Sequence, residues 1–241
     1  MEKQRLDRLI ASQTGISRKE AREAIKAGKA EIGDKVCRDS GLAVDIDSET
    51  VIFCGKPIKY KKFIYLLMNK PPGILSASND KTRKTVVDLV PEPLRRKGLF
   101  PVGRLDRDTT GMLIITDDGA FAHKLISPSS HIPKTYMAEL DCRLPEDAAE
   151  RFANGIILAD GTECRPALLE PLPENRARLT LTEGKYHEVK RMFGTLGAGV
   201  NSLHRESIGG LSLPEGLNMG ECVEMTEKWL NLVQKSVCYA F

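Results

Sequence analysis

The hydrophobic and polar positions of the first sixty residues predict two helices followed by short strands. Apolar residues recur at helical spacing over residues 6–10, and Gly15 can end that helix. Ser17, with Glu20 three residues later, forms a capping-box sequence, which predicts a second helix with Gly28 as its C-cap. Three short strands are expected next, at residues 30–32, 35–37 and 51–53.

The pattern after residue 62 predicts strands and helices that do not alternate regularly. Strands are expected at residues 63–68, 99–102, 112–116, 135–140, 177–182, 202–208 and 222–225, and helices at 120–127, 145–152 and 185–196. Many connections are too short for the crossover helices that a parallel sheet needs. This part of the chain is therefore predicted to be α+β, with a mixed, largely antiparallel sheet.

A charged stretch containing Gly and Pro, residues 55–62, separates these two patterns. We place a domain boundary there and predict a small domain at residues 1–60 and a larger one at residues 61–241. The larger segment is long enough to bury a hydrophobic core of its own.

The charge of the chain is distributed unevenly. The 241 residues carry a net charge of +3, which alone does not indicate a nucleic-acid partner. Residues 1–61 hold 13 Lys or Arg against 10 Asp or Glu, whereas residues 62–241 hold 23 of each. The whole surplus lies in the predicted small domain, as expected for a basic module attached to a neutral body.

The cations of the second predicted helix share one broad face. Arg18, Arg22 and Lys26 are each four residues apart, and Lys19 and Lys29 lie beside them. Like charges repel one another on a free helix but become favourable when phosphates neutralise them. A solvated basic face and a phosphate-binding face both fit this pattern.

Several classes of site lack support in the sequence. The six cysteines form no CxxC pair, so reduced thiols and no metal site are predicted. The P-loop, the dinucleotide glycine fingerprint and the GxSxG elbow are missing from the sequence. Neither a signal core nor a run of membrane-spanning length occurs, so a cytoplasmic protein without a membrane segment is expected.

The most informative polar segment is Gly103–Gly111, between two apolar stretches. It contains Asp106 and Asp108, and Arg104 and Arg107 lie beside them. The arginines oppose a metal site at this carboxylate pair, because they supply competing positive charge. They also favour the ionised form of Asp106, which suits a nucleophile or a general base.

Two further segments carry candidate chemistry. Tyr136 lies in a predicted strand, where its ring can fill the core or stack on a base. His187, Lys190 and Arg191 have i, i+3 and i+4 spacing, which places them on one face of a predicted helix. This face is either a basic helix start or a set of cations aimed at the Asp106 loop.

The first sixty residues resemble the small RNA-binding domain named after ribosomal protein S-four. The segments that carry the resemblance are RLDRLIAS, GISRKEAREAIKAGKAEIGDKV and VIFCGKPI, within about residues 3–58. The resemblance implies a helical and hairpin domain that presents its basic face to structured RNA. Residues placed near phosphates are Arg5, Arg18, Lys19, Arg22, Lys26 and Lys29.

The rest of the chain resembles the ribosomal small-subunit pseudouridine synthase A family. The matching segments are LMNKPPG, PVGRLDRDTTGMLIITDDG, KTY and LTEGKYHEVKRM, in this order. The resemblance implies a catalytic domain with a central cleft that isomerises a uridine of RNA to pseudouridine without cofactor or metal.

The resemblance also assigns roles to individual residues. It implies that Asp106 is the essential aspartate, that Tyr136 stacks on the target base and that Lys190 pairs with the aspartate. Residues implied in binding RNA are Arg104, Asn69 and Lys70. Arg191, next to Lys190 on the predicted basic face, is also expected to bind RNA. Arg107 occupies a variable position of the loop and receives no role.

The loop ending Asp108-Thr109-Thr110-Gly111 and the following TDDG resemble the branch that acts on small-subunit (16S) ribosomal RNA. Large-subunit (23S) ribosomal RNA is the alternative target, and an inactive RNA-binding assembly factor is the second alternative. The expected partner is ribosomal RNA or a small-subunit assembly intermediate. A monomer is expected.

Overall fold

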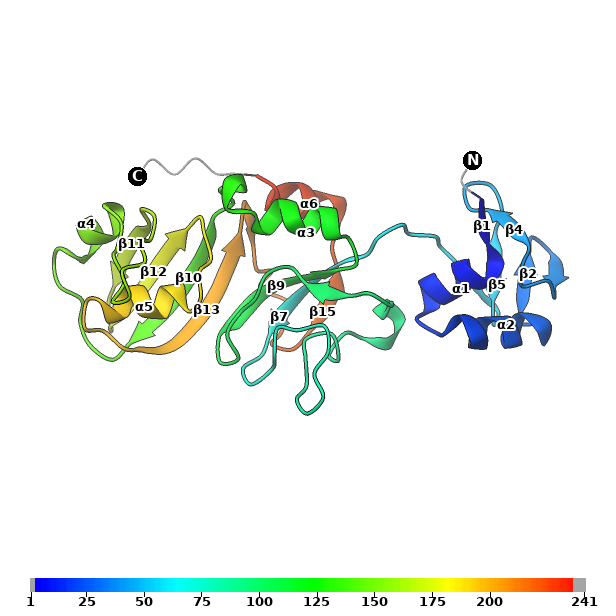
Figure 1. Cartoon of the computed structure of the whole chain (residues 1–241), viewed down its shortest axis with the longest axis horizontal. Coiled ribbons are helices and arrows are strands. Elements are labelled where there is room, and N and C mark those ends of the chain that lie inside the picture. The colour runs from blue at the N-terminus through cyan, green and yellow to red at the C-terminus, as the bar shows by residue number, and fades with distance from the viewer. Residues whose placement is uncertain (1–2, 236–241) are drawn as a thin grey trace. The chain divides into compact units, whose positions relative to one another are not determined.

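The computed structural model describes residues 3–235, which form two compact units. The first unit comprises the chain up to Ile64 together with Pro91–Leu99, and the second comprises Tyr65–Val90 and the chain from Phe100 onward. Figure 1 shows the elements of each unit. In the described part of the chain, none of the helices combines the length and apolar character of a membrane span.

The first unit contains the two predicted helices, α1 (Leu6–Thr14) and α2 (Arg18–Lys26). Gly15 ends α1 in the left-handed conformation, and Ser17 and Glu20 form the predicted capping box of α2. The C-cap of α2 is Ala27, one residue before the predicted Gly28. Apolar side chains of both helices pack in one core with the strands that follow.

The strands of the first unit form two small sheets. The order of the larger is β3 (Lys35–Cys37), β2 (Ala30–Ile32), β5 (Val51–Phe53) and β6 (Lys56–Ile58), and β1 (Lys3–Arg5) pairs with β4 (Ala43–Asp45) in the other. The predicted hairpin and third strand are confirmed. Residues 56–58, expected in the linker, instead extend the sheet as β6 because they continue a hairpin from β5.

The segment Pro91–Leu99 belongs to the first unit although it lies far along the chain. Arg96 anchors it, donating hydrogen bonds to the carbonyl oxygens of Ser12 and Lys61 at 3.0 Å each. Sequence patterning did not predict this return, because the anchoring contacts are made to backbone oxygens, which leave no pattern in the side chains.

The second unit is built on a nine-stranded sheet with the central order β11-β12-β10-β13-β9-β7-β15. These strands are β7 (Tyr65–Lys70), β9 (Thr110–Thr116), β10 (Lys134–Leu140), β11 (Leu168–Leu172), β12 (Arg176–Leu181), β13 (Val200–Ile208) and β15 (Cys222–Glu224), with β8 (Phe100–Pro101) on β9 and β14 (Leu211–Ser212) on β13. Every pairing is antiparallel except β9 with β13. The predicted α+β class and largely antiparallel sheet are confirmed.

The parallel pairing of β9 and β13 joins the two halves of this sheet through only two residue pairs. Gly111 makes the close approach possible, because a Cβ at this position would lie 2.4 Å from the carbonyl oxygen of Arg205. Its φ of +99° is also one that side-chain-bearing residues rarely adopt. This junction places the loop before β9 opposite β10 and β13.

Helices cover each half of the sheet (Figure 1). α3 (Gly119–Ile126) and α6 (Glu227–Val233) contribute to one core with β7 and β9. α4 (Ala148–Ala153) and α5 (Glu188–Gly194) meet on the other half, where Phe152 and Phe193 pack at 5.4 Å between ring centroids. Apolar periodicity did not predict α6 or β11, and β11 carries a strand-disfavouring Pro171.

Two predicted helices begin later than expected. α4 begins at Ala148 instead of Pro145, whose carbonyl accepts a bond from the Ala148 amide in a preceding turn. α5 begins at Glu188 instead of residue 185, because His187 has a φ of +48°. A left-handed residue cannot continue a right-handed helix, so the turn before α5 remains a separate segment.

Candidate active site

A buried lysine fixes the loop that carries Asp106. Lys70 is fully buried at the end of β7, and its Nζ donates hydrogen bonds to the carbonyl oxygens of Pro71, Arg107 and Thr109 at 3.0, 3.1 and 2.8 Å. Burial lowers the pKa of Lys70 to about 8. All three acceptors are backbone atoms, so Lys70 orders the loop without presenting its charge to a ligand.

Gly73 and Ser76, in the segment after β7, also hold the loop. The Gly73 amide donates to the carbonyl oxygen of Arg107 at 2.7 Å. Ser76 Oγ accepts from the Leu105 amide at 3.1 Å and donates to the Leu105 carbonyl at 2.9 Å. The loop backbone is therefore fixed on both sides of Asp106, as a reacting group requires.

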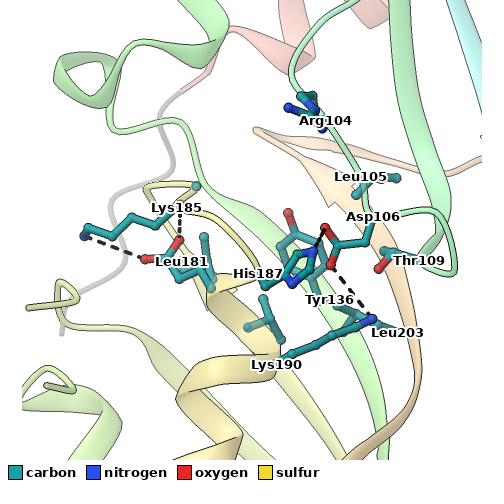
Figure 2. A pocket seen from close by; sticks show the side chains of 13 residues that line it. Arg104, Leu105, Asp106, Thr109, Tyr136, Leu181, Lys185, His187, Lys190 and Leu203 are labelled. Atoms are coloured by element: carbon teal, nitrogen blue, oxygen red, sulfur yellow. Dashed lines mark hydrogen bonds and ion pairs between the residues drawn. The ribbon is translucent and has the colours of Figure 1, made fainter. Parts of the chain in front are cut away.

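The carboxylate of Asp106 faces a cavity at the sheet junction (Figure 2). Its Oδ1 lies 3.3 Å from His187 Nε2, and its Oδ2 lies 3.9 Å from Lys190 Nζ. The lining of this cavity, called the Asp106 cavity below, includes Arg104, Asp106, Thr109, Tyr136, His187 and Lys190. The three residues with predicted catalytic roles, Asp106, Tyr136 and Lys190, thus line one cavity.

Lys190 is shared between two carboxylates. Its Nζ donates to both oxygens of Asp108 at 2.7 Å, closer than its 3.9 Å distance from Asp106. This bond lowers the pKa of Asp108. The sequence predicted that Lys190 pairs with Asp106, whereas in the structure its tighter partner is the more exposed Asp108.

His187 lies closer to the Asp106 carboxylate than Lys190 does, and sequence patterning misplaced it. The predicted i, i+3, i+4 helical face with Lys190 and Arg191 is wrong, because His187 precedes the helix in a left-handed conformation. Such a conformation costs about 1 kcal/mol or more for a non-glycine residue and is common at functional sites. Tyr186, which is exposed, stacks on the His187 ring at 3.9 Å.

Tyr136 lies on β10, directly opposite Arg205 of β13 in the sheet register. Its ring lines the Asp106 cavity although the residue as a whole is buried. Arg205 Nη1 donates to the Tyr136 hydroxyl at 3.4 Å. The ring is therefore held in place by its strand and by a buried guanidinium.

The other predicted RNA-binding residues of the second unit are placed differently from one another. Arg104 is exposed and lines the Asp106 cavity. Asn69 is buried and donates to the carbonyl oxygen of Leu217 at 2.9 Å. Arg191 lies outside the cavity lining and pairs with Asp160. Asn69 and Lys70 thus donate to backbone oxygens in the structure, and their predicted contact with RNA stays a prediction.

In the first unit, half of the predicted phosphate-binding cations converge on one carboxylate. Arg5, Arg18 and Arg22 contact the fully buried Asp7 at 3.2, 3.1 and 2.8 Å. Although burial alone would raise it, these guanidinium groups hold the pKa of Asp7 well below its ordinary value. Each arginine stays about half exposed. Lys19, Lys26 and Lys29 are exposed.

A second titratable cluster lies beside the Asp106 cavity. Cys164, Glu183 and Glu188 place possible ligand atoms within 4.8 Å of one another. Lys185 already pairs with both carboxylates, and burial raises the pKa of Cys164 to about 11. A cation partner and a protonated thiol suit a structural cluster better than a metal site.

We expect Glu188→Gln to stabilise the protein increasingly as the pH rises. Burial raises the pKa of Glu188 to about 7, so the folded chain binds more protons than the unfolded chain above about pH 4.3. Wild-type stability therefore falls relative to the variant as the pH rises through that window, by on the order of 2 kcal/mol. Urea unfolding at pH 5 and pH 8 measures the difference. Equal effects at both pH values, or the same trend in the exposed Glu150→Gln control, would exclude this explanation.

Comparison with known proteins decides the family. Residues 64–195 match the family described as RNA pseudouridylate synthase. The chain is 38% identical over 226 residues to ribosomal small subunit pseudouridine synthase A of Escherichia coli K12, covering 93% of this chain and 97% of that protein. The chain belongs to the RNA pseudouridine synthase family. The predicted family and enzyme class are confirmed.

Other relatives support the same assignment over nearly the full length. An uncharacterised RNA pseudouridine synthase of Bacillus subtilis strain 168, YtzG, is 42% identical over 236 residues, covering 96% of this chain and 98% of its own. A crystal structure of a pseudouridylate synthase matches with a TM-score of 0.67 at 33% identity, covering 95% of this synthase and 99% of that chain. The S-four resemblance of residues 3–58 stays a prediction, because the family match begins at residue 64.

Proposed function

We propose that this synthase isomerises one uridine of small-subunit (16S) ribosomal RNA to pseudouridine. The observation that carries the proposal is the Asp106 cavity, in which the aspartate, an aromatic ring and two basic side chains meet. The choice of RNA is supported by the name and coverage of the Escherichia coli relative. We place the activity in the cytoplasm and expect a monomer.

The reaction breaks the C1′–N1 bond of the target nucleoside and forms a C1′–C5 bond, with loss of the proton from C5 and gain of one at N1. The base must first leave its stack, which costs a few kcal/mol. Stacking on Tyr136 recovers about 1–3 kcal/mol of that cost. Asp106 then either attacks C1′ or removes the proton from C2′.

Lys190 and His187 have different roles beside Asp106. Lys190 lies 3.9 Å from one oxygen of the Asp106 carboxylate and donates to Asp108. It therefore holds one positive charge between the two carboxylates of the loop. His187 Nε2, 3.3 Å from the other oxygen, is placed to pass a proton to or from the reacting carboxylate. Arg104 holds the everted nucleotide or fills its gap at the cavity rim.

The first unit supplies the affinity for structured RNA in this proposal. Its α2 carries Arg18, Lys19, Arg22 and Lys26, with Arg5 on β1 and Lys29 after the helix. Asp7 orders the three arginines from inside. A single buried carboxylate leaves most of that positive charge available to phosphates. The S-four resemblance of this unit supports the same role.

We expect the double variant Lys19→Gln, Lys26→Gln to bind ribosomal RNA more weakly at every salt concentration. Each lost phosphate contact reduces the slope of log affinity against log salt by about one. Filter binding between low and moderate salt measures the slope. The control is Lys124→Gln with Lys228→Gln, two exposed lysines on α3 and α6 with the same change in charge. An equal slope change in both double variants would reject the role of α2.

The target is tested by comparing ribosomal RNA from cells with and without this protein, mapping pseudouridine on both subunits. We expect one mark to disappear from small-subunit RNA and to return when the gene is restored. Loss of a large-subunit mark would establish the alternative target. Loss of no mark would favour an inactive RNA-binding assembly factor, although the complete Asp106, Tyr136 and Lys190 set opposes that function.

A further inference from the structure

A second cavity adjoins the Asp106 cavity and contains two cations that the reaction described above does not use. The two cavities share Arg104, Tyr136 and Gly184. The second is lined further by Lys134 and Arg205, above an apolar wall that includes Ile114 and Leu125. A group that neighbours a nucleotide in the Asp106 cavity would therefore lie close to this second cavity.

The guanidinium of Arg205 is only partly satisfied. The residue is 3% exposed, and its Nε and Nη1 donate to the Met112 carbonyl and the Tyr136 hydroxyl at 2.7 and 3.4 Å. Nη2 is buried without a hydrogen-bond partner. Among residues 3–235, no carboxylate lies within ion-pairing distance of Arg205. Leaving a buried donor of a charged group unpaired costs free energy, so Nη2 is expected to bind a group of a ligand.

Lys134, on the neighbouring strand β10, also has hydrogen-bond donors without partners among the described residues. Its Nζ donates one hydrogen bond, to the Ile132 carbonyl at 3.0 Å, although an ammonium carries three donors. Within the described chain, Lys134 also has no carboxylate at ion-pairing distance. Burial, and to a smaller extent the charge of Arg205, lower the pKa of Lys134 to about 8.

We propose that Arg205 and Lys134 form an anion subsite that binds an RNA backbone phosphate next to the nucleotide in the Asp106 cavity. The proposal rests on the proposed function, since it takes RNA as the occupant of that cavity. A phosphate supplies several acceptor oxygens and a negative charge, which match the free Nη2 and the two remaining donors of Lys134. It also fixes the everted nucleotide through its backbone, whatever the flanking sequence.

The subsite is tested by titrating the full-length protein with uridine, uridine 5′-monophosphate and uridine 3′-monophosphate, followed by NMR so that millimolar affinities are measurable. We expect one monophosphate to bind about 10-fold more tightly than uridine to the wild-type protein. This advantage should fall below about threefold in Lys134→Gln and in Arg205→Gln, and Lys134→Gln should leave the affinity for uridine itself unchanged. Arg107→Gln, an exposed cation of the Asp106 loop, should retain the full advantage.

Several results would overturn the subsite. They are an absent phosphate advantage in the wild type and an advantage that persists in both variants. An equal loss of affinity for uridine in Lys134→Gln would also overturn it, because the lysine would then act on the base. Lys134→Gln carries the test if Arg205→Gln fails to fold in thermal unfolding. Pseudouridine mapping in cells separates this proposal from the proposed function, because the nucleotide affinities do not depend on which RNA loses a mark.

Discussion

Replacing Asp106 with asparagine is expected to lower pseudouridine formation by at least about 10⁴-fold while leaving the affinity for RNA within a factor of about three. Asparagine keeps the shape of the side chain but removes the carboxylate whose oxygen attacks C1′ or takes the C2′ proton. The loop itself should survive the change, because Lys70, Gly73 and Ser76 hold its backbone. Pseudouridine-specific labelling of substrate RNA measures the product, and filter binding measures the affinity.

Asp108→Asn is the matched control for this experiment. Asp108 lies in the same loop, carries the same charge and contacts the same lysine, but its side chain is far more exposed than that of Asp106. We expect a loss of about 10-fold, through displacement of Lys190 alone. Equal losses in the two variants, or a normal yield from Asp106→Asn, would reject the assignment of Asp106.

The second large effect is expected at Tyr136. Removing the ring in Tyr136→Ala should lower pseudouridine formation by about 10- to 100-fold, because stacking on the everted base is worth about 1–3 kcal/mol. Tyr136→Phe keeps the ring and removes only the hydroxyl that accepts from Arg205, so it should lose less. Initial rates on the same RNA measure both variants.

Tyr136 is buried, so packing and stacking must be separated in that experiment. Tyr136→Ala can destabilise the fold by about 3–5 kcal/mol, whereas Tyr136→Leu keeps an apolar side chain of useful volume. Thermal unfolding identifies variants that remain folded at the assay temperature. If Leu or Ala performs as well as Phe in a folded protein, the ring does not stack on the base.

The parts of the fold that the sequence predicted correctly depend on interactions between residues close together in the chain. The capping box of α2 needs only Ser17 and Glu20 three residues apart, and the end of α1 needs only Gly15. The Asp106 loop was identifiable because polar residues interrupt two apolar strands. These features depend on neighbours in the chain, so a single sequence contains them.

The remaining parts of the site depend on contacts across the sheet. Arg205 faces Tyr136 only through the register of β10 with β13, and the inward direction of Lys70 depends on how β7 and the loop pack. The contact of His187 with Asp106 depends on one left-handed residue, which helical spacing cannot reveal. Asp7 orders three arginines through contacts between elements, which no local sequence pattern reveals.

The most direct test of the central claim follows the hydrogen at C5 of uridine. Purified synthase is incubated with small-subunit ribosomal RNA that carries tritium at C5 of its uridines. Because the new C1′–C5 bond displaces that hydrogen, we predict tritium release to water that stops at one equivalent per RNA. Release should coincide with a single new pseudouridine and should be absent with Asp106→Asn. No release from any form of this RNA, or equal release by the two proteins, would contradict the account.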